Sequence, residues 1–469
     1  MTASYSTDHQ SKDIIEVNLN FQVFSCFTSI QNTRIAAMAQ ANGNPNTAEL
    51  TVPQPPGPRN SIATRGVHAD DPINSYTDVA PALHVSSTFR YPHDPDQLHP
   101  TDDLDIPDRE PGTAIAADSH IYSRLTAPNS SRLELLLTSL IGAPCLTYTS
   151  GLAAFHALLV YVNPKVVAIG AGYHGCHGVL DIYKKLTKCK VVDLFDEKSW
   201  DEAGLGKGDM VHLETPVNPT GKAYNIQYYA DLAHKRGAVL TIDSTFAPPP
   251  LQDPFKWGAD YVMHSGTKYI GGHSDMLCGV IAIGKNREGW EKDYWTMFGE
   301  RLHLGAVMGS MEGWLGVRSL RTFELRVARQ SQNADKLVAF LDGCLNGSEK
   351  GEAAEAVKAV VAKIDHASLQ ASEMGWLKKQ MPNGFGPVFS VDLKNGTQAR
   401  RLPSKLSLFH HATSLGGVES LIEWRRMSDN TVADTLCRVS VGVEAWEDLR
   451  DDLVHGCMEL AKEAELSMS

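Results

Sequence analysis

The chain lacks the marks of several protein classes. No apolar run approaches the roughly 18 residues that a membrane-spanning helix needs. Positive charge is in deficit, with a formal net charge of −12 at pH 7, whereas a surface that binds nucleic acid is basic. The eight cysteines are scattered, with no pair at the spacing of a zinc knuckle or a disulfide module. We therefore expect a cytoplasmic protein without a membrane or nucleic-acid partner.

The first 60 residues lack the pattern of a folded domain or of a targeting signal. Residues 14–30 are apolar but interrupted by polar side chains, unlike the core of a secretory signal. Only Lys12 and Arg34 are basic before Arg59, too few for a mitochondrial transit peptide. We predict a disordered extension over 1–60, in which Met38 offers an alternative start.

Length and pattern together predict more than one folded unit. A chain of 469 residues exceeds one simple hydrophobic core. We predict an N-terminal segment over 61–129, a large domain over 130–315 and a smaller C-terminal domain over 316–469. Residues 91–118, crowded with proline and aspartate, are expected to form a surface loop.

Short β-rich runs alternate with helical stretches in the large domain. The expected strands are 166–169, 190–195, 210–214, 238–242, 261–264 and 277–283, and the expected helices are 132–141, 151–161, 179–187 and 227–236. This alternation predicts an α/β fold with a mostly parallel sheet and helices on both faces. A helical segment over 305–340, broken near Gly316, leads to the smaller α/β unit, where 387–393 and 436–443 are expected strands.

A lysine between hydroxyl side chains carries the strongest chemical signal. Lys268 follows Ser265 and Thr267, directly after an expected strand, and Asp243 ends the strand before it. Ligands in parallel sheets bind beyond the carboxyl ends of the strands, where both residues fall. A pyridoxal phosphate enzyme needs this set: the amine forms a Schiff base, the hydroxyls hold the phosphate and the carboxylate keeps the pyridine nitrogen protonated.

Other motifs admit other interpretations. Ser150, Gly151 and Leu152 stand at an expected helix start, where free backbone N–H groups bind anions, although a simple helix cap has the same pattern. The glycines over 170–175 fit G-x-G-x-x-G after a strand, which keeps an NAD-dependent oxidoreductase as an alternative. Ser265-x-x-Lys268 matches the acylating motif of penicillin-recognising enzymes, but its companion motifs are missing.

Histidine and cysteine give weaker signals. His174 and His177 flank Cys176, and His410 and His411 are adjacent, but no carboxylates stand at a spacing that suits a metal. We expect no metal site. Cys176 is expected to be a surface or pocket thiol.

Several motifs together resemble the Cys/Met-metabolism, or trans-sulfuration, family of pyridoxal phosphate enzymes of fold type I. The resemblance spans residues 64–453. It is carried by Ala80–Phe89, Tyr122-Ser123-Arg124, Ser150-Gly151-Leu152, Glu214-Thr215-Pro216-x-Asn218-Pro219, Ser265-x-Thr267-Lys268, Ser414–Leu421 and Arg438–Glu444. It implies a homodimer with shared active sites, assembled further into a homotetramer, and a small amino-acid substrate.

The resemblance also implies roles for single residues. Tyr122 and Arg124 would reach the phosphate of the neighbouring subunit's cofactor. Tyr173 would stack on the cofactor ring and act as acid or base, and Asn218 would contact the ring hydroxyl. In the C-terminal domain, Arg438 would bind the substrate α-carboxylate. Ser414, in the same domain, would help to orient Lys268.

Three departures from the family pattern bear on the substrate. Enzymes that handle cystathionine commonly carry an arginine where this chain has Gly178, and an acidic residue where it has Thr413. Losing such buried charged contacts costs about 1.5–3 kcal/mol each. The segment Glu423-Trp424-Arg425-Arg426 replaces a proline-containing stretch, so Arg425 or Arg426 is either a substitute anchor or a solvated rim arginine.

We therefore expect elimination or replacement at the β or γ carbon of a sulfur amino acid or an O-acylhomoserine, with cystathionine disfavoured. A carbon–sulfur lyase, a cystathionine γ-synthase-like enzyme and a specialised biosynthetic γ-replacement transferase remain open. A non-enzymatic scaffold is a further alternative.

Overall fold

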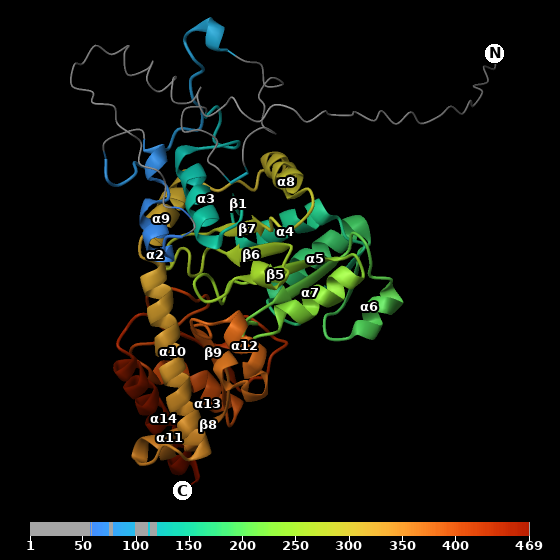
Figure 1. The fold of residues 1–469 in the computed structure, drawn as a ribbon. Coiled ribbons are helices and arrows are strands. Elements are labelled where there is room, and N and C mark those ends of the chain that lie inside the picture. Colours follow the sequence, from blue (N-terminus) through green and yellow to red (C-terminus); the bar gives the residue numbers. More distant parts are fainter. Residues whose placement is uncertain (1–56, 58, 75–77, 99–110, 113–119, 469) are drawn as a thin grey trace, which may run out of the picture. The chain divides into compact units, whose positions relative to one another are not determined.

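A seven-stranded sheet forms the centre of the larger part of the fold, with strand order β1-β7-β6-β5-β4-β2-β3 (Figure 1). All pairings among β2 to β6 are parallel, and β7 is antiparallel to both of its neighbours. The strands are β1 Cys145–Tyr148, β2 Val166–Ile169, β3 Lys190–Asp193, β4 Met210–Glu214, β5 Val239–Asp243, β6 Tyr261–Ser265 and β7 Gly279–Ile283.

The computed structural model describes residues 57, 59–74, 78–98, 111–112 and 120–468. The predictions made for residues 1–56, and for most of the loop over 91–118, lie outside these residues. The first described helix, α2 Ile62–His68, begins after Ser61, whose side chain accepts a hydrogen bond from the Thr64 amide. None of the described helices is long and apolar enough to cross a membrane.

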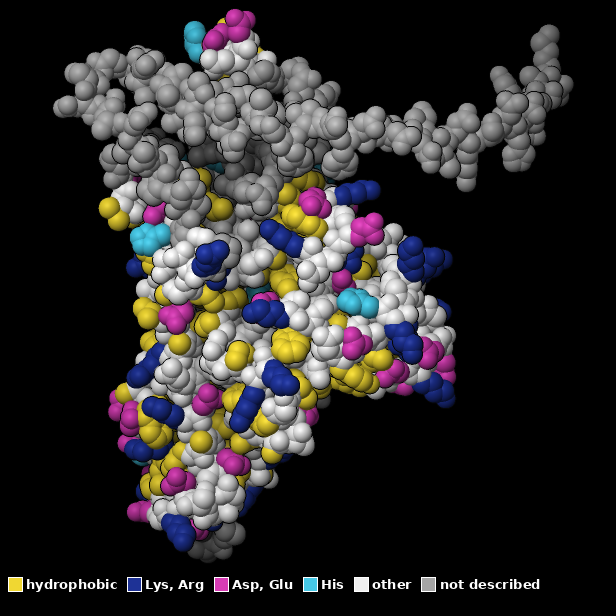
Figure 2. Space-filling view, viewed as in Figure 1, with side chains coloured by type: hydrophobic (Ala, Val, Ile, Leu, Met, Phe, Trp, Pro, Cys, Tyr) yellow, Lys and Arg dark blue, Asp and Glu magenta, His cyan; other side chains and the backbone are white. Residues whose placement is uncertain are grey.

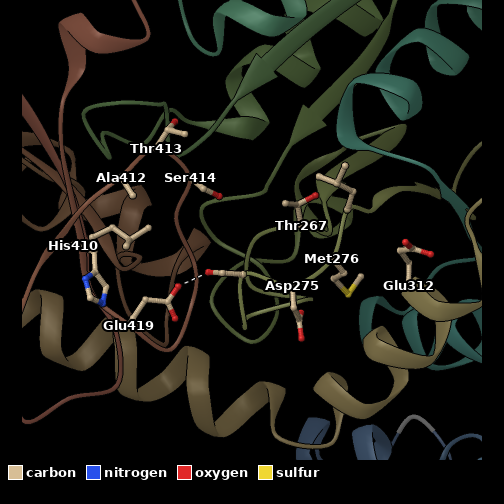
Figure 3. Close-up of a pocket in the computed structure, with 12 residues that line it drawn as sticks. Thr267, Asp275, Met276, Glu312, His410, Ala412, Thr413, Ser414 and Glu419 are labelled. Carbon is tan, nitrogen blue, oxygen red and sulfur yellow. Dashed lines mark hydrogen bonds between the residues drawn. The ribbon is translucent and has the colours of Figure 1, made fainter.

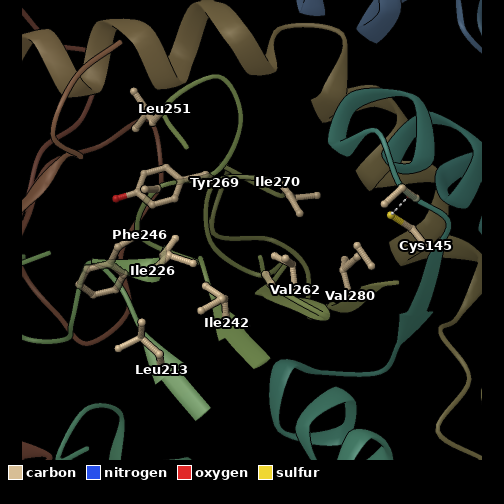
Figure 4. Close-up of a cluster of buried hydrophobic side chains, with 14 of the residues drawn as sticks. Cys145, Leu213, Ile226, Ile242, Phe246, Leu251, Val262, Tyr269, Ile270 and Val280 are labelled. Atoms are coloured by element: carbon tan, nitrogen blue, oxygen red, sulfur yellow. Dashed lines mark hydrogen bonds between the residues drawn. The ribbon is translucent and has the colours of Figure 1, made fainter. Parts of the chain in front are cut away.

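Helices cover both faces of the seven-stranded sheet because its strands are apolar on both sides. On β6, Val262 belongs to one core cluster and its neighbours Tyr261 and Met263 belong to another. Alternation within one strand therefore feeds two separate cores. Figure 4 shows the first cluster, where strand, loop and helix side chains converge. The helices are α3 Pro128–Ile141, α4 Gly151–Val162, α5 His174–Thr187, α6 Glu197–Ala203, α7 Ile226–Lys235 and α8 Trp290–Leu304.

A second, five-stranded sheet has the order β10-β11-β12-β9-β8 and its own apolar core. Its strands are β8 Val361–Asp365, β9 Val388–Leu393, β10 His410–His411, β11 Leu421–Trp424 and β12 Leu436–Ser440. The helices from α9 onward are α9 Ser310–Leu320, α10 Phe323–Asn346, α11 Glu352–Val360, α12 Met374–Gln380, α13 Gly396–Arg401 and α14 Trp446–Met468. The predicted fold class, a mostly parallel sheet followed by a smaller α/β unit, is confirmed. The predicted domain limits stay predictions.

The predicted helix break near Gly316 is wrong. Helix α9 continues through Gly316, and the break falls at Arg321–Thr322, between α9 and α10. A Cβ at Gly316 would lie 2.8 Å from the Leu133 Cδ2 atom. The glycine therefore allows α9 to approach α3 closely. This close packing, and not a kink in the helix, accounts for a glycine at position 316.

Charge is mixed over the surface. On the face shown in Figure 2, basic and acidic side chains are interspersed and hydrophobic side chains lie between them. The net negative charge is therefore not gathered into a single-sign patch on this face.

Candidate active site

The predicted site residues of the large sheet meet where three neighbouring parallel strands end. Glu214, Asp243 and Ser265 are the last residues of β4, β5 and β6. Glu214 and Asp243 are paired in the β4–β5 register. The backbone ladder therefore fixes these side chains at one edge of the sheet, before any side-chain contact is considered.

Lys268 lies three residues beyond β6 and contacts the C-terminal part of the chain. Its Nζ donates to the Ser414 Oγ atom at 2.8 Å. The loop that carries Ser414 runs close to it, because a Cβ at Gly416 would lie 2.9 Å from the Lys268 carbonyl carbon. Burial lowers the pKa of Lys268 to about 8, helped by Arg438 and opposed by Glu423 and Asp243.

Asp243 is a buried carboxylate without a cationic partner. Its Oδ1 accepts hydrogen bonds from the Thr245 amide at 3.0 Å and the Thr245 hydroxyl at 2.5 Å. No lysine, arginine or histidine among the described residues lies within ion-pair distance of it. Burial raises its pKa, while the Thr245 hydrogen bonds and the charge of Lys268 oppose the rise. A buried carboxylate that lacks an ion-pair partner is suited to bind a cationic nitrogen of a ligand.

Glu214 connects two loops of the site. Its carboxylate accepts the backbone amides of Tyr173 and Asn218, each at 2.6 Å. Burial and Asp243 raise the pKa of Glu214 to about 8, and the two amides oppose the rise. Sequence reasoning gave Glu214 no role of its own, since a strand-end glutamate alone does not reveal which amides it will meet.

The glycines of the G-x-G-x-x-G pattern serve this site. A Cβ at Gly172 would lie 2.2 Å from the Glu214 Oε2 atom, and one at Gly175 would lie 2.5 Å from the Tyr173 ring. Tyr173 precedes α5 and keeps an exposed fraction of 36%. The pattern therefore shapes the turn that presents Tyr173.

Hydroxyls and helix amides line the third side of the site. Ser150 caps α4 by accepting from the Ala153 amide at 3.1 Å, so Gly151 and Leu152 contribute the first backbone N–H groups of that helix. A Cβ at Gly151 would lie 3.2 Å from the Ser265 Oγ atom, which places the helix start against Ser265. These groups form an anion cradle.

The Thr267 hydroxyl belongs to the same side of the site but is already engaged. It accepts a hydrogen bond from the Cys278 amide at 3.0 Å, which ties the turn before Lys268 to the start of β7.

Arg438, on β12, is buried and is bound to the same residue as the lysine, Ser414. Its Nη2 donates to the Ser414 carbonyl at 2.8 Å and to the Glu423 Oε2 atom at 2.7 Å. Its Nη1 donates to the Asn218 Oδ1 atom at 3.2 Å. The structure thus brings together Lys268, Ser414, Asn218 and Arg438, predicted from segments far apart in the chain.

The two arginines of the unusual segment differ. Arg425 is 2% exposed and donates to Glu423 at 2.8 Å, so the interpretation as a solvated rim arginine is wrong for it. Its neighbour Arg426 is exposed and donates to the carbonyl of Asn430. The pairing of Arg425 depends on a fold that seats both partners in the interior, which the sequence did not reveal.

A cavity of about 900 Å³ opens beside Ser414 (Figure 3). Thr413 lies on its wall, as does Thr267. Among the described residues, no lysine or arginine lines it. Its charged and titratable lining consists of three carboxylates and one histidine: Asp275, Glu312, Glu419 and His410. The Ser274 hydroxyl donates to Glu419, which engages one of the three.

Tyr122 and Arg124 stand apart from this cluster in the single chain. Both are exposed, and the Arg124 guanidinium lies 5.4 Å from the centre of the Tyr122 ring. No described contact joins either residue to Lys268. Their predicted role across a subunit interface stays a prediction.

Cys176 is buried in α5, and burial raises the pKa of its thiol, with Asp243 and Glu214 adding to the rise. Of the two alternatives, a surface thiol is therefore wrong, and a pocket thiol stays a prediction. Among the described residues, no three histidine, cysteine or carboxylate side chains gather as a metal site requires.

A buried lysine beside an uncompensated carboxylate and an anion-binding helix start is the site of a pyridoxal phosphate enzyme, and comparison with known proteins agrees. The family model for Cys/Met metabolism PLP-dependent enzymes matches residues 63–458. The chain belongs to this family and is a pyridoxal phosphate-dependent enzyme of the trans-sulfuration type.

Relatives with several activities resemble the chain. It is 33% identical to a cystathionine beta-lyase of Lactococcus lactis subsp. cremoris, over 71% of this chain and 87% of that protein. It is 31% identical to the cystathionine gamma-synthase of Escherichia coli K12, over 84% of this chain and 97% of that protein. The crystal structure of apo CalE6, a methionine gamma lyase from Micromonospora echinospora, is similar with a TM-score of 0.70 and 30% identity. The match covers 85% of this chain and 99% of that one.

The residues present fit the cofactor. Asp243 offers an uncompensated buried charge for the pyridine nitrogen, and Lys268 offers an amine of lowered pKa for the aldehyde. Helix α4 and Ser265 offer donors for the phosphate. Neither the family nor these relatives support the NAD-dependent alternative, and two of the glycines that suggested it, Gly172 and Gly175, pack against Glu214 and Tyr173.

Proposed function

We propose that the enzyme eliminates or replaces a substituent at the β or γ carbon of a small sulfur amino acid or an O-acylhomoserine. One observation carries the proposal: Lys268 is held by Ser414, beside the uncompensated carboxylate of Asp243. A lysine so placed supplies both a point of attachment and a base at the same atom.

Asp243, Tyr173 and Lys268 have different roles in this reaction. Pyridoxal phosphate, when bound, supplies the electron sink for the bond that breaks at Cα. Asp243 holds negative charge against the pyridine nitrogen, and Tyr173 covers the ring. The Lys268 amine removes the Cα proton, for which a pKa of about 8 leaves a useful neutral fraction near neutral pH.

Substrate binding falls to the C-terminal part of the chain. Arg438 binds the α-carboxylate with the N–H groups that Asn218, Ser414 and Glu423 leave free. Ser414, which lines the cavity, accepts a hydrogen bond from the Lys268 amine.

The cavity supports the choice of substrate class. Its described lining, three carboxylates without a lysine or arginine, disfavours a second acid group at the far end of the substrate. At the position of Thr413 itself, a substrate ammonium group finds no charge to pair with. A side chain ending in a thioether, a thiol or an acyl ester therefore fits better than the distal amino acid of cystathionine.

A substrate panel tests this proposal. The holoenzyme is given methionine, cysteine, homocysteine, O-acetylhomoserine, O-succinylhomoserine and cystathionine, each with and without a thiol acceptor, and the products are identified. We expect the highest kcat/KM on a substrate without a distal carboxylate. Highest kcat/KM on cystathionine would contradict the proposed substrate class. Highest kcat/KM on O-succinylhomoserine, which also carries a distal carboxylate, would keep that class but contradict the argument from the cavity lining.

The assembly proposed is a homodimer with shared sites. It is supported by the exposure of Tyr122, Arg124 and nearby apolar residues, with Val79 at 99% and Val85 at 82%. Mixed dimers of Arg124→Ala and Lys268→Ala chains should regain part of the activity, because one of the two sites then has both residues intact. Well-formed heterodimers without any regain would exclude the shared site.

A cytoplasmic location is proposed with it. The seven cysteines that the structure describes are all free and buried, which suits a reducing compartment.

A further inference from the structure

Four buried charges of alternating sign run away from the active site, starting at Arg438. We name Arg438, Glu423, Arg425 and Asp429 the charge row. Arg438 and Arg425 both donate to the Glu423 Oε2 atom, at 2.7 and 2.8 Å. Arg425 also lies 3.6 Å from Asp429. All four residues are at most 9% exposed, so water screens these charges little.

Glu423 is a problem for the proposed role of Arg438. It forms an ion pair with the guanidinium that is to receive a substrate carboxylate, and it carries the same charge as that carboxylate. The Ser428 hydroxyl donates to its second oxygen at 2.6 Å, and this bond together with the two arginines lowers the pKa of Glu423 against the effect of burial. Glu423 is therefore ionised at neutral pH.

Arg425 offsets this charge. It shares the Oε2 atom with Arg438 from the other side and adds a hydrogen bond to Ser428 at 3.0 Å. With all four members of the charge row ionised, their charges cancel. Without the Arg425 charge, the row would carry one net negative charge beside the substrate carboxylate, and Arg438 would lose its attraction for anions.

We propose that Arg425 is a positioning residue that keeps Arg438 available to the substrate α-carboxylate by neutralising Glu423. This inference rests on the proposed function, in which Arg438 binds that carboxylate. It also replaces the hypothesis that Arg425 grips a distal substrate carboxylate. The ion pairs of Arg425 with Glu423 and Asp429 already account for a buried guanidinium at this position, so no substrate carboxylate is needed to explain it.

A double-mutant cycle tests the proposal in the holoenzyme. The variants are Glu423→Gln, Arg425→Gln and the double variant, with Arg426→Gln as the matched control, because Arg426 is the exposed neighbour outside the charge row. The probes are L-norleucine and n-pentylamine, which is norleucine without its carboxylate. Dissociation constants are measured by calorimetry, so no turnover is needed.

Arg425→Gln should weaken norleucine binding about tenfold or more, the effect of losing one charged contact. Pentylamine binding should change less than about threefold, since no carboxylate is involved. The double variant should return norleucine binding to within about threefold of the unmodified enzyme, because the net charge of the row is restored. Arg426→Gln should leave both constants unchanged.

A double variant that binds norleucine as weakly as Arg425→Gln would overturn the proposal, as would equal losses for the two probes. If Arg425→Gln does not fold, the double variant decides alone: a tenfold loss of norleucine binding that spares pentylamine overturns the neutralising role. Arg438→Lys distinguishes failure of the proposed role of Arg438 from failure of the proposed role of Arg425. If it leaves norleucine binding intact, the proposed function of Arg438 fails; if it weakens binding and Arg425→Gln does not, only this inference fails.

Discussion

The two walls of the active site are built in different ways. On the sheet wall, Glu214, Asp243 and Ser265 end three neighbouring strands, so the hydrogen-bond ladder sets their spacing. On the opposite wall, Thr413 and Ser414 come from a loop between β10 and β11. Rigid strand ends suit the cofactor, whose chemistry is common to the family, whereas loops accept the substitutions that change the substrate.

The largest expected effect lies on the sheet wall. Lys268→Ala removes the attachment amine and the base together, so turnover should fall by at least about 10⁴-fold. The visible absorbance of the lysine-bound cofactor should vanish, and borohydride should no longer fix pyridoxal to the protein. A variant that keeps its absorbance and its turnover would place the chemistry elsewhere.

A substitution on the loop wall should change selectivity instead. Thr413→Glu adds a carboxylate to the cavity, where it can pair with the distal ammonium of cystathionine. The ratio of kcat/KM for cystathionine to that for methionine should rise about tenfold, the value of one charged contact. Thr413→Gln is the control of equal size. An equal rise in both variants would show that charge is not the cause.

The pH dependence of cofactor uptake separates Lys268 from ordinary lysines. Only the neutral amine attacks the aldehyde, so the rate of uptake by cofactor-free enzyme should rise as pH rises through about 8, the lowered pKa. An unperturbed lysine would rise only near its usual pKa of about 10.4. Stopped-flow absorbance between pH 6 and 10 measures the midpoint; a midpoint near 10 would refute the lowered pKa.

A pair of glycines gives the smallest expected effect. Gly172→Ala places a methyl group against the Glu214 carboxylate, so the variant should lose about 1–3 kcal/mol of unfolding free energy, as overpacked cores do. Gly178→Ala, inside α5 with open space around it, should be neutral or up to about 1 kcal/mol more stable. Denaturant unfolding of both proteins measures the difference. Equal stabilities would show that Glu214 moves aside at little cost.

Strands that appear in the sequence as short apolar runs could be predicted from the sequence alone. The run Val166–Ile169 was predicted with the bounds that the structure has, because four apolar residues between a lysine and a glycine are typical of a buried strand. Strand β1 was missed, since Cys145–Tyr148 is a short run that lies between two helices, close to both. The strand β8 was missed for a similar reason: it follows α11 without an intervening turn.

The sequence by itself determined the chemistry of the cofactor side, because Lys268, Asp243 and the hydroxyls are read from single segments that follow strands. It also determined the family, since several motifs must occur together. Only the tertiary structure decided which charges meet. Whether Arg425 is solvent-exposed or bound to Glu423 depends on how β11 and the turn after it are buried, and burial is a property of the whole fold that no short pattern encodes.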